Sequence, residues 1–160
     1  FSTTSNEEQV NMMVENFSAN FPKSLVKTNA ADIKLYMELL MGNFRNAEYK
    51  IKSAKLVDNE YQEGEKIAEI KYDVTFKVPQ KLSEAQIKEA EKLKTKNAKP
   101  EDMKKILAIM IDSLKNASIS VTQEQNFSLY QLKEGDKIFY FNGSPDQLVS
   151  DNIDFYLDNI

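Results

Sequence analysis

A chain of 160 residues that is 41% hydrophobic and 29% charged has the size and composition of one folded domain, and it is too apolar to be disordered. Its net charge of −4 and its single arginine, Arg45, argue against a nucleic-acid binder, which needs a basic face. Because cysteine and histidine are both missing, no disulfide, thiol nucleophile or imidazole base can form, and we expect neither a metal nor a cofactor.

The first residues are polar and are followed by a helix start. We interpret residues 1–5 as a polar tether and residues 6–160 as a single α+β domain. A start at Phe1 is typical of a mature exported protein, although a sequence trimmed for other reasons would begin in the same way. No apolar run approaches the roughly 20 residues that span a bilayer, so any membrane contact would come through an upstream anchor.

Two helices are predicted in the first third of the chain. Ser5 and Glu8 have the spacing of a capping box, and apolar residues follow it at helical spacing as far as Phe17. Thr28 or Asn29 can cap a second helix, which runs to about Phe44. Together these segments predict an N-terminal helix pair.

From residue 47 the apolar period changes to two. Residues 47–53 alternate as a first strand, residues 58–64 form a polar turn, and residues 68–78 make the clearest strand, which Pro79 ends. We expect antiparallel pairing with one face of the sheet on a core and the other exposed to water. The predicted covered face consists of Ile70, Tyr72, Val74, Phe76 and Val78.

Residues 82–115 return to a helical period and form a predicted two-helix insert. Ser83 with Gln86 can cap its first helix, and Pro100 opens its second. The second helix has a broad apolar stripe that includes Met103 and Met110. The stripe either packs on the domain's own sheet or binds a partner, since methionine suits adaptable interfaces.

The last third of the chain predicts two further strands and a helix. One strand starts at Ile119, a turn lies at residues 134–136, and the return strand covers residues 138–141. A C-terminal helix begins near Pro145 and adds an irregular apolar side to an existing core. The predicted fold is therefore α+β: an N-terminal helix pair packed on a curved four-stranded antiparallel sheet, with the two-helix insert between strands 2 and 3 and a C-terminal helix.

Two groups of side chains are candidates for a site. The strand acids Glu69, Asp73 and Glu124 could in principle do acid–base work, but they lie among lysines on a wet face, which favours ion pairs over catalysis. Aromatic residues on strands and on a helix either line an apolar ligand pocket or fill the core. The candidate pocket residues are Tyr36, Tyr49, Tyr72, Phe76 and Phe139.

The element order, over residues 10–142, resembles that of bacterial lipoprotein domains with the NTF2-like, or cystatin-like, α+β fold. The likeness includes residues 51–55, residues 70–78 and the hairpin at residues 132–138. The resemblance implies an extracytoplasmic protein, a surface-anchored lipoprotein domain, and it supplies no catalytic residues.

Two functional hypotheses follow. The first is a non-enzymatic exported binding or interaction domain whose partner is an unknown protein or a small apolar ligand. The second is a small-molecule pocket protein with weak enzymatic activity, based on the strand tyrosines and a buried acid. The sequence decides neither the ligand nor the oligomeric state.

Overall fold

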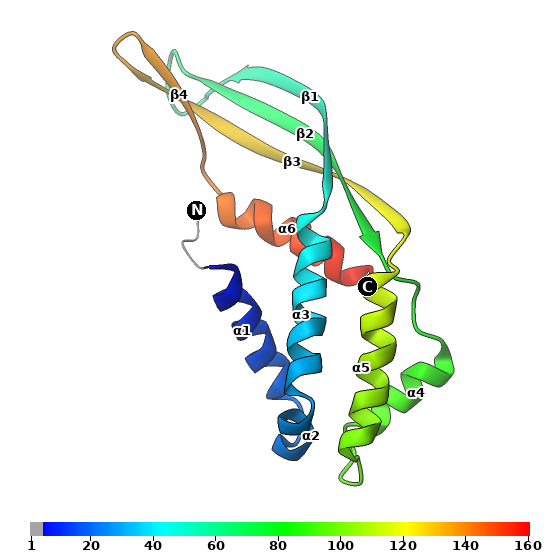
Figure 1. Ribbon diagram of the computed structural model, residues 1–160. Coiled ribbons are helices and arrows are strands. Elements are labelled where there is room, and N and C mark those ends of the chain that lie inside the picture. The colour runs from blue at the N-terminus through cyan, green and yellow to red at the C-terminus, as the bar shows by residue number, and fades with distance from the viewer. Residues whose placement is uncertain (1–4) are drawn as a thin grey trace. The chain divides into compact units, whose positions relative to one another are not determined.

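The computed structural model describes residues 5–160 and has the predicted α+β architecture (Figure 1). Its contacts divide the chain into two compact units. The helical unit comprises the chain up to Asn46, residues 77–119 and Ile160, and the sheet unit comprises residues 47–76 and 120–159. Of the predicted tether, residues 1–4 lie outside the described part, and Ser5 is the N-cap of the first helix.

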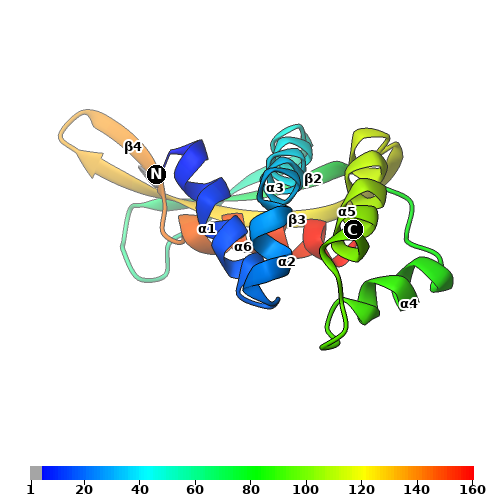
Figure 2. The same ribbon diagram turned by 60° about the horizontal axis from the view of Figure 1, so that its bottom comes forward.

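The helical unit contains five helices among the described residues. They are α1 (Asn6–Ser18), α2 (Lys23–Thr28), α3 (Ala30–Arg45), α4 (Glu84–Lys92) and α5 (Pro100–Lys115). Within the unit α3 packs against both α1 and α5, and α4 runs beside α5 (Figure 2). The core of the unit is formed by Leu25, Ile33, Leu93, Met103, Ile106, Leu107 and Ile111.

Both predicted capping boxes are confirmed. At α1 the backbone N–H of Glu8 donates to Ser5 Oγ over 3.2 Å, and the N–H of Ser5 donates to the Glu8 carboxylate over 2.7 Å. At α4 the N–H of Gln86 donates to Ser83 Oγ over 3.3 Å, and Gln86 Oε1 accepts from the N–H of Ser83 over 2.8 Å. Each box satisfies two backbone donors that a helix end leaves unpaired.

The N-terminal region holds one more helix than the sequence predicts. The six residues of α2 follow Pro22, whose fixed φ suits a helix start and whose carbonyl accepts from the N–H of Leu25 over 3.0 Å. A helix this short has too few residues to show an apolar period, so the pattern gives no signal for it. Leu25 is nevertheless fully buried in the core of the helical unit.

The sheet unit is a four-stranded antiparallel sheet with the strand order β1-β2-β3-β4 and one helix. Its elements are β1 (Glu48–Asp58), β2 (Lys66–Val78), β3 (Ile119–Glu134), β4 (Lys137–Asn142) and α6 (Pro145–Asp158). The last two residues of β2, Lys77 and Val78, and the first residue of β3, Ile119, belong to the helical unit. The tight turns before β2 and between β3 and β4 use Gly64 and Gly135, whose φ angles are 79° and 59°.

The predicted apolar face of β2 is confirmed. Tyr72, Val74, Phe76 and Val78 are buried and Ile70 is half-buried, while Lys71 and Lys77 are exposed. Within the sheet unit α6 covers part of this face. The ring of Phe76 lies 5.0 Å from that of Tyr156 and 5.9 Å from that of Phe155, measured between centroids.

For β1 the expectation of a covered apolar face is wrong. Tyr49 is 57% exposed and Ile51 is 60% exposed, whereas side chains of β2 and β3 make contacts with α6. The register between β1 and β2 also shifts between Ile51 and Ser53, where Lys52 forms a bulge. β1 is an edge strand of the sheet. The alternation of apolar and polar residues in β1 therefore predicts a strand correctly, but no helix of the described sheet unit covers the apolar face of that strand.

Candidate ligand site in the helical unit

The amphipathic helix α4 forms one wall of the candidate site. Its apolar residues Ile87 and Ala90 recur at helical spacing together with the C-cap residue Leu93, and Leu93 is buried in the core of the helical unit. No residue between Glu84 and Lys92 is buried, so α4 rests on its neighbours through a narrow stripe. Such a helix covers the apolar surface of its neighbours but leaves unfilled space between them.

Under this stripe lies a cavity of about 380 Å³ that we name the Phe17 cavity. Phe17 and Phe21 form one side, α4 forms another, and Met103 and Ile106 of α5 lie on the core side. The rings of Phe17 and Phe21 stack at 5.0 Å between centroids. The remaining lining residues are Leu82, Ile87, Ala90, Glu91, Leu93, Lys94, Leu107 and Met110.

A second cavity of about 380 Å³, which we name the Tyr36 cavity, adjoins the first. The two share three lining residues: Leu82, Ile87 and Met110. The rings of Tyr36 and Phe17, one from each cavity, lie 6.4 Å apart between centroids. The other lining residues of the Tyr36 cavity are Pro79, Gln80, Lys81, Ser113, Leu114 and Ile160.

The two cavities differ in chemistry. The Phe17 cavity is lined by aromatic and aliphatic side chains, with Glu91 and Lys94 exposed at its margin. The Tyr36 cavity adds the hydroxyls of Tyr36 and Ser113, the amide of Gln80 and the ammonium group of Lys81. Burial raises the pKa of the Tyr36 hydroxyl above its ordinary value of 10, so near neutral pH it keeps its proton and can donate a hydrogen bond.

The predicted methionine stripe has two different environments. Met103 is fully buried among Leu25, Ile33 and other helical residues, so it is not a surface for a partner. Its cover is helical and does not come from the sheet, as the pattern of the stripe alone had allowed. Met110 is half-buried and lines both cavities.

The predicted pocket residues occupy different environments. Tyr36 lines its cavity in the helical unit, and the other four belong to the sheet unit. Phe76 is fully buried against α6, and the hydroxyl of the buried Tyr72 donates to Asn152. Tyr49 lies 6.0 Å from Tyr72 between ring centroids but is mostly exposed, and Phe139 is exposed on β4. Core packing therefore accounts for Tyr72 and Phe76.

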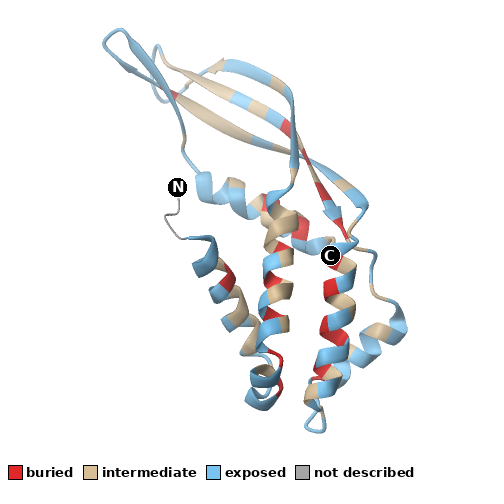
Figure 3. Ribbon diagram, in the orientation of Figure 1, coloured by how far each residue is buried: buried red, intermediate tan, exposed pale blue. Residues whose placement is uncertain are grey.

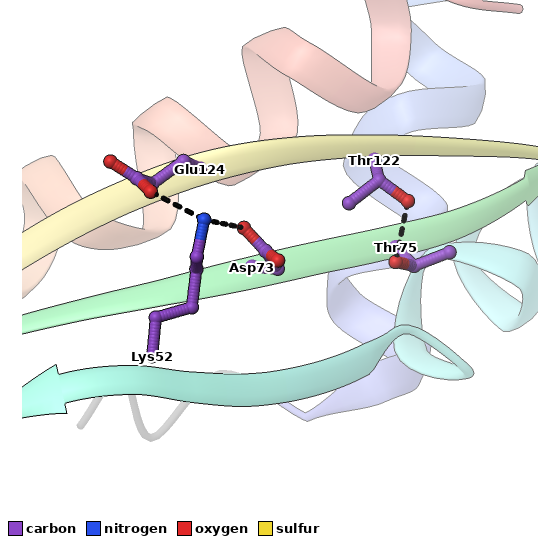
Figure 4. Close-up of polar contacts among 5 residues, drawn as sticks. All are labelled: Lys52, Asp73, Thr75, Thr122 and Glu124. Carbon is purple, nitrogen blue, oxygen red and sulfur yellow. Dashed lines mark hydrogen bonds and ion pairs between the residues drawn. The ribbon is translucent and has the colours of Figure 1, made fainter.

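Two of the three strand acids, Asp73 and Glu124, form an ion-paired cluster with Lys52 in the sheet unit (Figure 4). The Nζ atom of Lys52 lies 2.7 Å from the Glu124 carboxylate and 3.6 Å from that of Asp73. The hydrogen bond from Lys52 and then its positive charge lower the pKa of Glu124, and the same contacts raise the pKa of Lys52. Beside them the hydroxyls of Thr75 and Thr122 bond over 2.8 Å. A carboxylate held ionised in this way is a poor general acid.

The structure also bears on the second hypothesis, which needs a buried acid. Among residues 5–160 no Asp or Glu is buried; the buried side chains with polar groups are the amides Asn29, Gln131 and Asn152 and the hydroxyl-bearing Tyr72 and Tyr156. No group of acidic side chains in that range could hold a metal ion, and no helix there is long and apolar enough to cross a bilayer. Comparisons with family models, with curated proteins and with solved structures find no match.

Part of the cavity lining has no signal in the sequence. Ile87 belongs to the predicted stripe of α4, but residues 79–82 lie in a loop with no period, and nothing in their pattern indicates that Lys81 and Leu82 line a cavity. These residues line the cavity only because the loop that connects β2 to α4 passes beside it in the folded chain.

Proposed function

We propose that this chain is a non-enzymatic binding module that holds a small amphipathic anion, a single-chain carboxylate such as dodecanoate, in the helical unit. The observation that carries the proposal is the pair of adjoining cavities, of which one is lined mainly by apolar side chains and the other adds polar groups to an apolar lining. Their volumes lie in the range of about 300–1,000 Å³ that is usual for small-molecule sites.

The division of chemistry between the cavities supports this ligand class. A hydrocarbon chain in the Phe17 cavity gains about 0.8 kcal/mol per buried CH₂ group. In the Tyr36 cavity a carboxylate would meet Lys81 and two hydroxyl donors, and hydrogen bonds to a charged group are the stronger kind. The narrow contact of α4 offers a way in, because no residue from Glu84 to Lys92 is buried and only the C-cap residue Leu93 anchors the helix in the core.

A membrane-tethered, extracytoplasmic setting is part of the same proposal, and it rests on the resemblance alone. The proposed ligand class is consistent with it, because a domain held near a bilayer meets molecules with acyl chains. A lipid-attachment cysteine encoded upstream of Phe1 would support this setting, and its absence from the full reading frame would contradict it.

The first test is isothermal titration calorimetry with dodecanoate. We expect binding to the parent protein, and a loss of affinity of at least about tenfold in Ile87→Glu, which places a second carboxylate between the two cavities. Met12→Glu is the matched control, because Met12 is a similarly exposed apolar residue of α1 outside both linings. Equal binding by both variants, or none by the parent protein, contradicts the proposal.

The second test separates the acidic head from the apolar chain. Lys81→Glu should weaken dodecanoate much more than the uncharged dodecanol, since only the carboxylate loses an attractive charge. Lys88→Glu, an equal charge change on α4 outside both linings, should leave the affinities for both ligands nearly unchanged. If Lys81→Glu weakens both ligands equally, the head group is not bound where we place it.

A further inference from the structure

We propose that β4 is a dimerisation edge, at which a second copy of this chain adds its own β4 in antiparallel orientation. In the strand order β1-β2-β3-β4, β4 is the last strand. Within residues 5–160 no strand pairs with its outer side, so that side offers backbone donors and acceptors to another strand.

The side chains of β4 are exposed on both faces. Four consecutive large apolar residues have 46–54% of their surface exposed: Ile138, Phe139, Tyr140 and Phe141. Figure 3 shows exposure along the length of the strand. Across the ladder Phe139 lies opposite Leu132, and Phe141 lies opposite Tyr130, with 5.8 Å between the centroids of the last two rings. The outer strand therefore carries apolar surface above and below its free backbone edge.

The two edges of the sheet differ in how they are protected. The other edge strand, β1, carries the exposed lysines Lys50, Lys52 and Lys55 and a bulge at Lys52, both of which hinder pairing with a further strand. Between Lys137 and Asn142, β4 has no charge and no proline, and its register with β3 runs without a shift. Edges are normally protected, so an unprotected apolar edge indicates a strand that is covered in the working protein.

A second copy fits this edge better than an unlike strand in three respects. Antiparallel self-pairing puts Lys137 of each copy across from the uncharged end of the other β4, so no like charges oppose each other. The contact is two-fold symmetric, so it closes after one partner is added. The resulting eight-stranded sheet would have β1 at both outer edges, where the lysines prevent further growth.

The first test is the mass of the protein in solution, measured by sedimentation equilibrium across a concentration series. We expect a dimer for the parent protein and a monomer for the double variant Phe139→Lys with Phe141→Lys. The matched control, Tyr49→Lys with Ile51→Lys, changes two exposed apolar residues of the other edge and should remain a dimer. A monomeric parent, an assembly larger than a dimer, or a dimer in which both double variants behave alike would overturn the proposal.

A second test leaves the apolar strand almost intact. The chain has no cysteine, so single cysteines introduced at Phe139 or Tyr140 can cross-link only between copies. In a two-fold antiparallel pair only the residue on the axis lies directly opposite its own copy, with its Cα atoms within the range of about 4.4–6.8 Å that a disulfide needs. One of the two variants should therefore oxidise to a covalent dimer, and oxidation of neither would contradict the pairing. A cysteine at Lys55 of β1 should not oxidise to a covalent dimer. Preferential cross-linking at Lys55 would place the interface at the wrong edge.

Discussion

Tyr72 of β2 donates its hydroxyl to Oδ1 of Asn152 of α6 over 3.0 Å, and both side chains are buried. The bond joins the sheet to its own helix within the sheet unit. The ring of Tyr72 also meets that of Phe127 edge-on at 5.8 Å between centroids. Burial raises the pKa of the Tyr72 hydroxyl above its ordinary value, so the donor keeps its proton over the physiological range.

Replacing Tyr72 by Phe should lower the free energy of unfolding by about 1–3 kcal/mol, because the buried amide oxygen of Asn152 loses its donor. Chemical denaturation measures the change. Tyr49→Phe removes the same atom from an exposed ring in contact with Tyr72, and it should change stability by less than about 0.5 kcal/mol. Equal effects would show that the Tyr72 hydroxyl makes no net contribution.

Asn29 should be equally sensitive, for a reason internal to the helical unit. Its buried Nδ2 donates to the carbonyl of Leu25 over 2.9 Å and to the carbonyl of Pro100 at the start of α5 over 3.1 Å. We expect Asn29→Leu to cost about 1–3 kcal/mol, since it leaves two carbonyls without this donor. As control, Asn116→Leu removes an exposed bond to the carbonyl of Asp112, and thermal melting should show a smaller loss.

The Lys52–Glu124 contact should be visible in an acid titration. Because the pKa of Glu124 lies below its ordinary value of 4.5, the contact stabilises the fold above that value and is lost as the pH falls through the lowered pKa. An NMR titration of the Glu124 carboxyl should give a midpoint below 4.5, and Lys52→Met should move it upward. Lys55→Met changes a lysine of the same strand and should leave the midpoint where it is. An unchanged midpoint in Lys52→Met would contradict the contact.

Removing the chain after Gly143 should abolish cooperative folding of the sheet unit. The sequence alone predicts a helix docked on an existing core, whose removal would lower stability without abolishing the fold, because terminal elements are often the least stable. The structure instead places Tyr156 fully buried against Phe76 and supplies the partner of Tyr72 from the same helix. Far-UV circular dichroism of the truncated chain during thermal melting measures the outcome. A cooperative melt that retains the strand signal would show that α6 is docked on a sheet that folds without it.

The local sequence pattern by itself determined the helices and strands that have a clear apolar period or a complete capping box. The alternation from Ile70 to Val78 predicts both the strand and its buried face, since only one side of a pleated strand can meet a core. The capping boxes at Ser5 and Ser83 predict helix starts, because the bonds join residues only three positions apart. The exclusion of cysteine and histidine chemistry also needs no structure.

The tertiary structure alone decided which of these surfaces are covered. Asn29 has the residue type of a helix cap, yet its side chain bridges to Pro100, 71 positions away. Ile51 and Phe139 have the same apolar character as Val74, but they lie on edge strands and stay exposed, whereas Val74 is fully buried. The cavities beneath α4 combine residues that lie far apart in the chain, from Phe17 to Ile160. The burial of a side chain depends on which other elements pack against it, and the local sequence pattern carries no information about those elements.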